Sequence, residues 1–175
     1  VLMFGQYMET YGKNIVQYDN FDWIYIQTEH FDIYTYHPGE ENGDLVAIES
    51  ERAYDNLSNL LNWKLKNRVS IIVYNSHNDF QQTNVVKQYM QEGIGGVTEL
   101  YKNRVVIPFD GSLIAFRDVL HHELFHAFIN DCVYGGSLRK KITRSIEFNI
   151  PLWMNEGLAE YSASNWDTNS DMWMR

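Results

Sequence analysis

The run HHELFHAFIND, residues 121–131, places two histidines four positions apart, with a glutamate directly after the first of them. In an α-helix, residues four apart stack on one face, so His122 and His126 can both reach one metal ion. Glu123 then projects beside the ion rather than onto it, where it can accept a proton from a water molecule as a general base. This run therefore predicts a helix that carries a metal site.

The same run has a plainer interpretation, in which His122 and His126 are hydrogen-bonded core residues and Glu123 is a salt-bridged carboxylate. The flanking pairs Val119-Leu120 and Ala127-Phe128 are apolar, which is typical of a helix buried in a core. Buried imidazole and carboxylate groups need partners, and zinc is the natural partner for this set. The metal interpretation is therefore favoured over the plainer one.

A catalytic zinc site has three protein ligands and keeps a fourth position for water, so a further ligand is expected. One common arrangement places a glycine and a third histidine within six residues of the second, but Ile129 and Cys132 occupy those positions. The later run LWMNEGLAEY, residues 152–161, carries two glutamates one helical turn apart, Glu156 and Glu160. Both are candidates for the third ligand on their spacing alone.

Both runs resemble those of one known family. HHELFHAFIND is similar to the motif of thermolysin-like peptidases, and WMNEGLAEY resembles the zinc-ligand helix of aminopeptidase-type gluzincins and of bacterial peptidase MA-like domains. The resemblance implies that Zn2+ is bound by His122, His126 and Glu156. It also implies that Glu123 is the base and that Asn155 orients one of the ligand histidines.

Two neighbouring residues, Glu160 and Asp118, are candidates for supporting roles, whereas His121 is left out of the site. Glu160 is expected to be a carboxylate behind the ligands or on the surface of its helix. Asp118, one turn before His122, either orients that histidine or is an exposed acid. His121 points about a third of a helical circle away from His122 and is expected to form a local hydrogen bond.

A glycine-rich segment, GGVTE at residues 95–99, precedes the predicted metal helix. In the family that the chain resembles, an edge strand in this place binds the substrate backbone, and a glutamate of a Gly-rich motif binds the free amine in aminopeptidases. The resemblance makes Gly96 and Glu99 candidate substrate-binding residues, although a turn with a solvated glutamate is the plainer interpretation. For the donor that stabilises the oxyanion, Tyr134 and Tyr161 are merely the tyrosines nearest in sequence, and no assignment follows.

Hydrophobic periodicity predicts the secondary structure, because period two is typical of strands and a period of three to four is typical of helices. After an irregular segment over residues 1–22, the predicted strands are 30–36, 69–74, 97–101 and 104–109, and the last two form a hairpin. The predicted helices are 44–63, one capped at 75–76 and broken at 93–96, 113 to about 133, 137–148, and one from 151. This order predicts an α+β fold. The resemblance implies a zincin (thermolysin-like) catalytic domain, with a small twisted mixed sheet, an antiparallel edge hairpin and a partial C-terminal helical lobe.

The length of 175 residues suits a single domain, with residues 1–112 mainly carrying the sheet and residues 113–175 the metal-binding helices. Apolar residues make up 45% of the chain, which favours a packed core. Because the chain does not begin with Met and stops at Arg175 without a capping residue, we expect a fragment of a longer protein. The resemblance suggests a bacterial parent protein, periplasmic or secreted, with further domains such as a β-propeller.

Charge and cysteine content argue against several functions. The 14 basic residues are mostly scattered and are outnumbered by 23 acidic ones, for a net charge of -9, so nucleic acid is not an expected partner. The single cysteine, Cys132, can form neither an internal disulfide nor a Cys-based zinc site. No apolar run reaches the roughly 20 residues that span a bilayer, so no transmembrane segment is expected.

We therefore expect a zinc-dependent peptidase in which Glu123 is the general base and a peptide or protein is the substrate. The sequence leaves open whether cleavage occurs within chains or at their amino termini. One alternative is a zinc-binding but catalytically inactive interaction domain of a larger envelope protein, against which the intact Glu123 argues. A metal-free structural domain is a second alternative, which metal analysis distinguishes from both.

Overall fold

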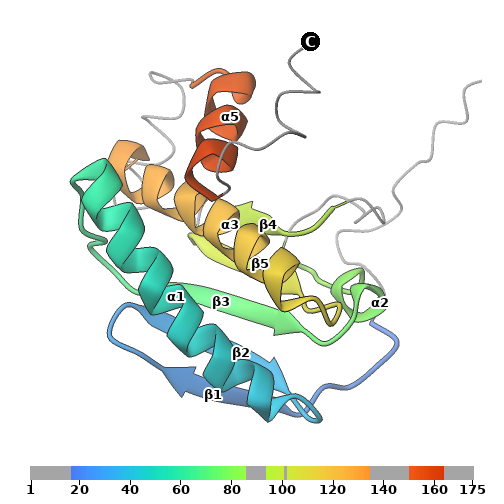
Figure 1. Cartoon of the computed structure of the whole chain (residues 1–175). Helices are drawn as coiled ribbons and strands as arrows, with labels where there is room; N and C mark the ends of the chain where they lie inside the picture. The colour runs from blue at the N-terminus through green and yellow to red at the C-terminus, as the bar shows by residue number, and fades with distance from the viewer. Residues whose placement is uncertain (1–16, 86–93, 101, 135–149, 164–175) are drawn as a thin grey trace, which may run out of the picture.

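The computed structural model describes residues 17–85, 94–100, 102–134 and 150–163 (Figure 1). Five strands lie within these ranges: β1 (Trp23–Gln27), β2 (Phe31–Tyr36), β3 (Val69–Tyr74), β4 (Val97–Glu99) and β5 (Arg104–Pro108). The helices within them are α1 (Glu40–Leu61), α2 (His77–Phe80), α3 (Leu113–Tyr134) and α5 (Leu152–Ala163). The predicted α+β class is confirmed.

The five strands form one mixed sheet in the order β1-β2-β3-β5-β4. The central pairs β2–β3 and β3–β5 are parallel, whereas the outer pairs β1–β2 and β4–β5 are antiparallel. Parallel neighbours need a crossover connection, and α1 supplies it between β2 and β3. The antiparallel β4–β5 pair forms the hairpin that the sequence predicted, and it places β4 at an edge of the sheet.

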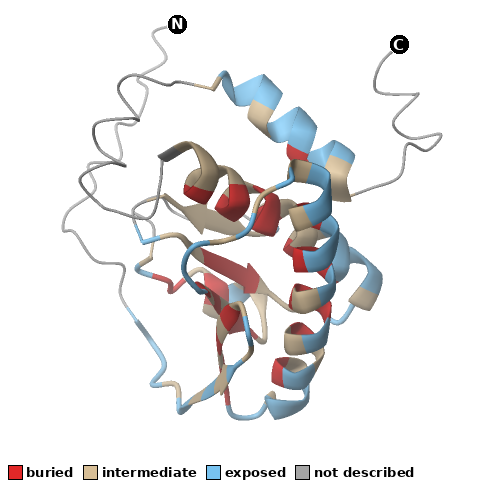
Figure 2. Ribbon diagram, turned by 90° about the vertical axis from the view of Figure 1, so that its left-hand side faces the viewer, coloured by how far each residue is buried: buried red, intermediate tan, exposed pale blue. Residues whose placement is uncertain are grey.

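Helices α1 and α3 pack against each other and cover one face of the sheet (Figure 1). Buried residues lie along the inner faces of the two helices (Figure 2), and their side chains form the main hydrophobic core with those of the strands. They include Phe31, Ile33, Ile71, Val73, Val105 and Ile107 from the strands and Val46, Leu57, Leu120, Leu124 and Phe128 from the helices. Because burying such a side chain contributes about 1.5–3 kcal/mol, this layer is the main source of stability.

Two elements differ from the sequence-based expectation. No strand was predicted before residue 30, yet β1 pairs with β2 along its whole length. Trp23 and Tyr25 of β1 are 44% and 51% exposed, so this edge strand lacks the polar and apolar alternation on which the prediction relied. Helix α1 begins at Glu40 rather than residue 44, because the acidic first turn suits the positive end of the helix dipole and adds a turn before the apolar stripe.

The helix predicted after residues 75–76 is shorter than expected. Ser76 does cap α2, since its side chain accepts a hydrogen bond from the backbone N–H of Asp79, but the helix ends at Phe80. Residues 86–93 and the helix predicted over 137–148 lie outside the described residues. In the part of the chain that the structure describes, no helix combines the length and apolarity needed to cross a bilayer.

Buried charged side chains fix α3 against its neighbours. Glu49 of α1 accepts hydrogen bonds from Arg52, at 3.0 Å, and from Arg117 of α3, at 2.7 Å. Near the other end of α3, the buried carboxylate of Asp131 accepts hydrogen bonds from Trp63 Nε1, at 3.0 Å, and from the backbone N–H of Lys66, at 3.2 Å. These contacts set the position of the helix that carries the HHELFHAFIND run.

Replacing Asp131 with alanine should destabilise the fold strongly. The change leaves the indole N–H of Trp63 and the amide of Lys66 without their acceptor, and a lost charged acceptor of this kind costs about 2–3 kcal/mol. Urea unfolding should show this loss for Asp131→Ala and a change below about 0.5 kcal/mol for Asp55→Ala on the exposed face of α1. Equal midpoints for the two variants would show that Asp131 does not hold α3 in place.

Candidate metal centre

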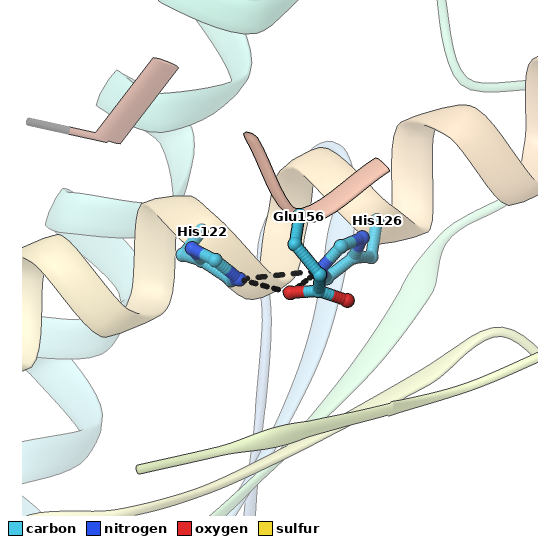
Figure 3. Close-up of side chains that lie close together, drawn as sticks. All are labelled: His122, His126 and Glu156. Carbon is cyan, nitrogen blue, oxygen red and sulfur yellow. Dashed lines mark hydrogen bonds and ion pairs between the residues drawn. The ribbon is translucent and has the colours of Figure 1, made fainter. Parts of the chain in front are cut away.

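Two histidines of α3 meet one glutamate of α5 (Figure 3). The four-residue spacing brings Nε2 of His122 and Nε2 of His126 to 3.2 Å from each other. Oε2 of Glu156 lies 3.2 Å from Nε2 of His122 and 3.5 Å from Nε2 of His126. The structure thus brings together, from two helices, the three residues proposed as ligands.

Two features set the position of helix α5: the hydrogen bonds of its first turn and one small buried residue. The carbonyl of Pro151, just before the helix, accepts hydrogen bonds from the backbone N–H groups of Met154 and Asn155. Ala159 is fully buried in the main core, whereas Trp153 is 77% exposed. A small side chain at the contact allows close helix approach, so α5 sits near enough to α3 for Glu156 to reach the histidines.

The spacing of the three atoms fits a tetrahedral zinc site. Ligand atoms about 2.0–2.2 Å from a tetrahedral zinc ion lie about 3.3–3.6 Å from one another. The three observed separations run from 3.2 to 3.5 Å. Two imidazoles and one carboxylate are also a ligand set of catalytic zinc sites, so both the geometry and the chemistry fit this ion.

The environment of His126 favours the form that binds metals. Burial lowers the pKa of His126, and the nearby carboxylate of Glu156 only partly opposes this. A metal-ligating histidine must be neutral, so the lowered pKa of His126 favours metal binding. Nδ1 of His126 and Oδ1 of Asn155 are both buried and lack a hydrogen-bond partner among the described residues. The side chain of Asn155 opposes the lowering of the pKa of His126. It therefore lies close enough to orient the imidazole ring of His126.

Glu123 lies beside His122 at the cavity and contacts Thr98 of strand β4. The residue is 7% exposed, and its Oε2 accepts a hydrogen bond of 2.6 Å from the hydroxyl of Thr98. Burial raises the pKa of Glu123, the Thr98 hydroxyl and His122 oppose the rise, and Glu156 adds to it. A carboxylate with a raised pKa beside a metal site is suited to taking up and releasing a proton.

Gly96 makes room for the Glu123 side chain. A Cβ atom at Gly96 would lie 2.8 Å from Cγ of Glu123 and 2.8 Å from Cγ2 of Ile107, both closer than van der Waals contact. The same Cβ would lie 3.1 Å from Oε1 of Glu123. Gly96 was predicted to bind substrate, and the structure places it against the candidate base, where no larger residue fits.

Glu160 lies at the second nitrogen of His122. Its Oε2 is 3.5 Å from Nδ1 of that ring, whereas Glu156 meets Nε2. A carboxylate at the far nitrogen fixes the tautomer and orientation of a ligand histidine, which is one of the two roles expected for Glu160. Asp118 is exposed and acts electrostatically on His121, whose pKa is lowered by burial.

The remaining candidates do not lie with the three candidate ligands. Glu99 accepts hydrogen bonds from the side chain of Arg104, at 3.2 Å, and from the backbone N–H of Lys102, at 3.0 Å. Its carboxylate is thus used within the β4–β5 hairpin. Tyr161 is 68% exposed, and the side chain of Tyr134 lies outside the described residues.

Thr98 is the residue of this site that the sequence analysis missed. The resemblance selects Gly96 and Glu99 of the GGVTE segment, but successive side chains of a strand point to opposite faces. The period of two pairs Gly96 with Thr98 on the face towards α3 and turns Glu99 away from it. That rule places Thr98 on the same face as Gly96, but it does not identify Glu123 as the partner of Thr98.

A cavity of about 350 Å³ opens beside the centre. It lies between the start of β4, the first half of α3 and the end of α5, and its lining includes Gly95, Gly96, Asp118, Val119, His122 and Glu123. One candidate ligand and the candidate base therefore both face a space of the size that holds a substrate group.

Removing Glu156 and removing Glu160 should affect zinc binding differently. Glu156→Ala deletes a ligand and should weaken zinc affinity by more than the roughly 10- to 100-fold typical of supporting residues, whereas Glu160→Ala should stay within that range. Competition with a chromophoric chelator measures the zinc affinity of each variant. Loss of zinc in Glu160→Ala with retention in Glu156→Ala would reverse the assignment.

Comparison of the chain with protein-family models, with curated proteins and with solved structures finds no significant match. No relative therefore supplies a fold family or an activity.

Proposed function

We propose that this chain is a zinc-dependent peptidase of the gluzincin type with a zincin fold. The observation that carries the proposal is the convergence of His122, His126 and Glu156 at the separations of a tetrahedral zinc site. The buried Glu123 next to them adds a proton acceptor. Ligands with an adjacent base are the parts that metal-assisted hydrolysis requires.

The proposed reaction uses the side chains in distinct roles. His122, His126 and Glu156 would hold zinc, which when bound would polarise the scissile carbonyl and lower the pKa of the attacking water. Glu123 accepts a proton from that water while the oxygen of the water bonds to the carbonyl carbon. Glu123 then donates the proton to the nitrogen of the leaving amine as the C–N bond breaks. Glu160 and Asn155 orient the rings of His122 and His126.

A peptide substrate is supported by the surroundings of the centre. Strand β4 pairs with β5 on one side and is the last strand of the described sheet, so its outer edge can add the backbone of an extended peptide. Thr98 of β4 contacts the candidate base, so a peptide on this edge lies close to the reacting groups. The adjacent cavity can receive a side chain next to the cleaved bond.

The hairpin bears on the type of cleavage. Amine capture by Glu99 would make the centre an aminopeptidase, but that carboxylate is bound to Arg104 within the hairpin. Because the Glu99 carboxylate is already paired, it is not free to bind the amino terminus of a substrate. We therefore propose a peptidase that does not use Glu99 to bind a free amino terminus.

Glu123→Gln should separate catalysis from metal binding. Glutamine keeps the size of the side chain but cannot accept the proton, so kcat/KM on a cleaved peptide should fall by about 10²- to 10⁴-fold. Zinc content should stay equal to wild type, whereas His126→Ala should lose both zinc and cleavage. Glu41→Gln, on the exposed surface of α1, is the matched control and should retain wild-type rates.

Two outcomes would contradict the proposal. Cleavage by zinc-loaded Glu123→Gln at the wild-type rate would remove Glu123 as the base. A zinc-loaded wild type that cleaves no member of a broad peptide library would favour an inactive zinc-binding domain instead.

A further inference from the structure

The hydroxyl of Thr98 makes two contacts with one residue of the metal helix. Its Oγ1 lies 2.6 Å from Oε2 of Glu123 and 2.9 Å from the backbone carbonyl oxygen of Glu123. A hydroxyl has a single proton, and separations of 2.5–2.7 Å are typical of O–H groups that donate to a charged carboxylate. The shorter contact is therefore the one that Thr98 makes as a donor to the side chain.

This contact distinguishes the two oxygens of Glu123. Oε2 is held by Thr98, whereas Oε1 lies beside Gly96, where an added Cβ would be 3.1 Å away. Gly96 and Glu123 both line the cavity next to His122. Oε1 is thus the oxygen left to face the groups that enter the site.

We propose that Thr98 is a positioning residue that holds Oε2 of Glu123 so that Oε1 receives the proton during hydrolysis. This inference rests on the proposed peptidase function. Thr98 also belongs to the edge strand on which the peptide backbone is proposed to lie. It therefore sets the position of the base relative to the bound peptide, because one side chain joins strand β4 to the base on α3.

A purely structural role makes a different prediction. If Thr98 only ties β4 to the backbone of α3, its loss should lower stability and leave the turnover of the folded enzyme unchanged. If it positions the base, its loss should lower kcat more than KM, because a misplacement of reacting groups by about 1 Å can cost 10²-fold in rate.

The kinetic test compares three variants of the zinc-loaded protein. Thr98→Val keeps the shape but removes the hydroxyl, and kcat should fall by roughly 10- to 100-fold with little change in KM or zinc content. Thr98→Ser restores a hydroxyl and should recover most of the rate. Thr35→Val is the control, because Thr35 is fully buried in β2 and its hydroxyl bonds to the carbonyl of Gly39, away from the centre. It should keep the wild-type kcat.

A second measurement needs no activity and no metal. In the zinc-free protein, Thr98→Val should lower the melting temperature more in the wild-type background than in a Glu123→Ala background, where only the backbone carbonyl contact remains. Equal shifts in the two backgrounds would show that the hydroxyl does not engage the carboxylate, and would overturn the inference.

The outcomes separate this inference from the proposed function. An active wild type with unchanged kcat in Thr98→Val, or with equal losses in Thr98→Val and Thr98→Ser, would overturn the role of Thr98 and leave the peptidase intact. A zinc-loaded wild type without peptidase activity would overturn both, while the thermal comparison would still report whether the contact exists.

Discussion

Successive residues of α3 face three different neighbours, and the candidate site depends on this one helix being held in all three directions. His122 faces α5, Glu123 faces strand β4 and Leu124 is buried in the core against the sheet. Consecutive residues of an α-helix are about 100° apart, so the motif suits a helix enclosed on three sides. A rotation of α3 about its axis would move the candidate ligands and the candidate base together. The bonds of Glu49 and Asp131 to neighbouring elements resist such a rotation.

Burying the charged and polar groups of this candidate site costs free energy when no metal ion is bound. Glu123 is buried with Glu156 nearby, and both effects raise its pKa. Nδ1 of His126 is buried without a partner among the described residues. A divalent cation would offset several of these costs, because it attracts the carboxylates and accepts the lone pairs of both imidazoles. The hydrophobic layer between the sheet, α1 and α3 supplies the stability that offsets the free-energy cost of such a site.

Local patterns predicted the parts of the molecule whose structure depends on nearby residues. The four-residue spacing of His122 and His126 indicated their common face, alternation identified β2, and a short apolar run identified β3. Strand β1 was missed because an exposed edge strand with Trp23 and Tyr25 outward has no clear alternation. Thr98 was missed because its partner lies 25 residues along the chain, so the contact depends on how β4 packs against α3. Spacing alone could not choose between Glu156 and Glu160, since their places at different nitrogens of His122 are set by the packing of α5 on α3.

The proposed centre holds one zinc ion between His122, His126 and Glu156. Anomalous diffraction at the zinc edge, from crystals of the zinc-loaded chain, tests this claim most directly because it locates the ion independently of the protein atoms. We expect a single strong peak about 2.0–2.1 Å from a ring nitrogen of each histidine and about 2.0–2.2 Å from an oxygen of Glu156. A peak bound by Glu160 in place of Glu156, or no peak between α3 and α5, would contradict this expectation.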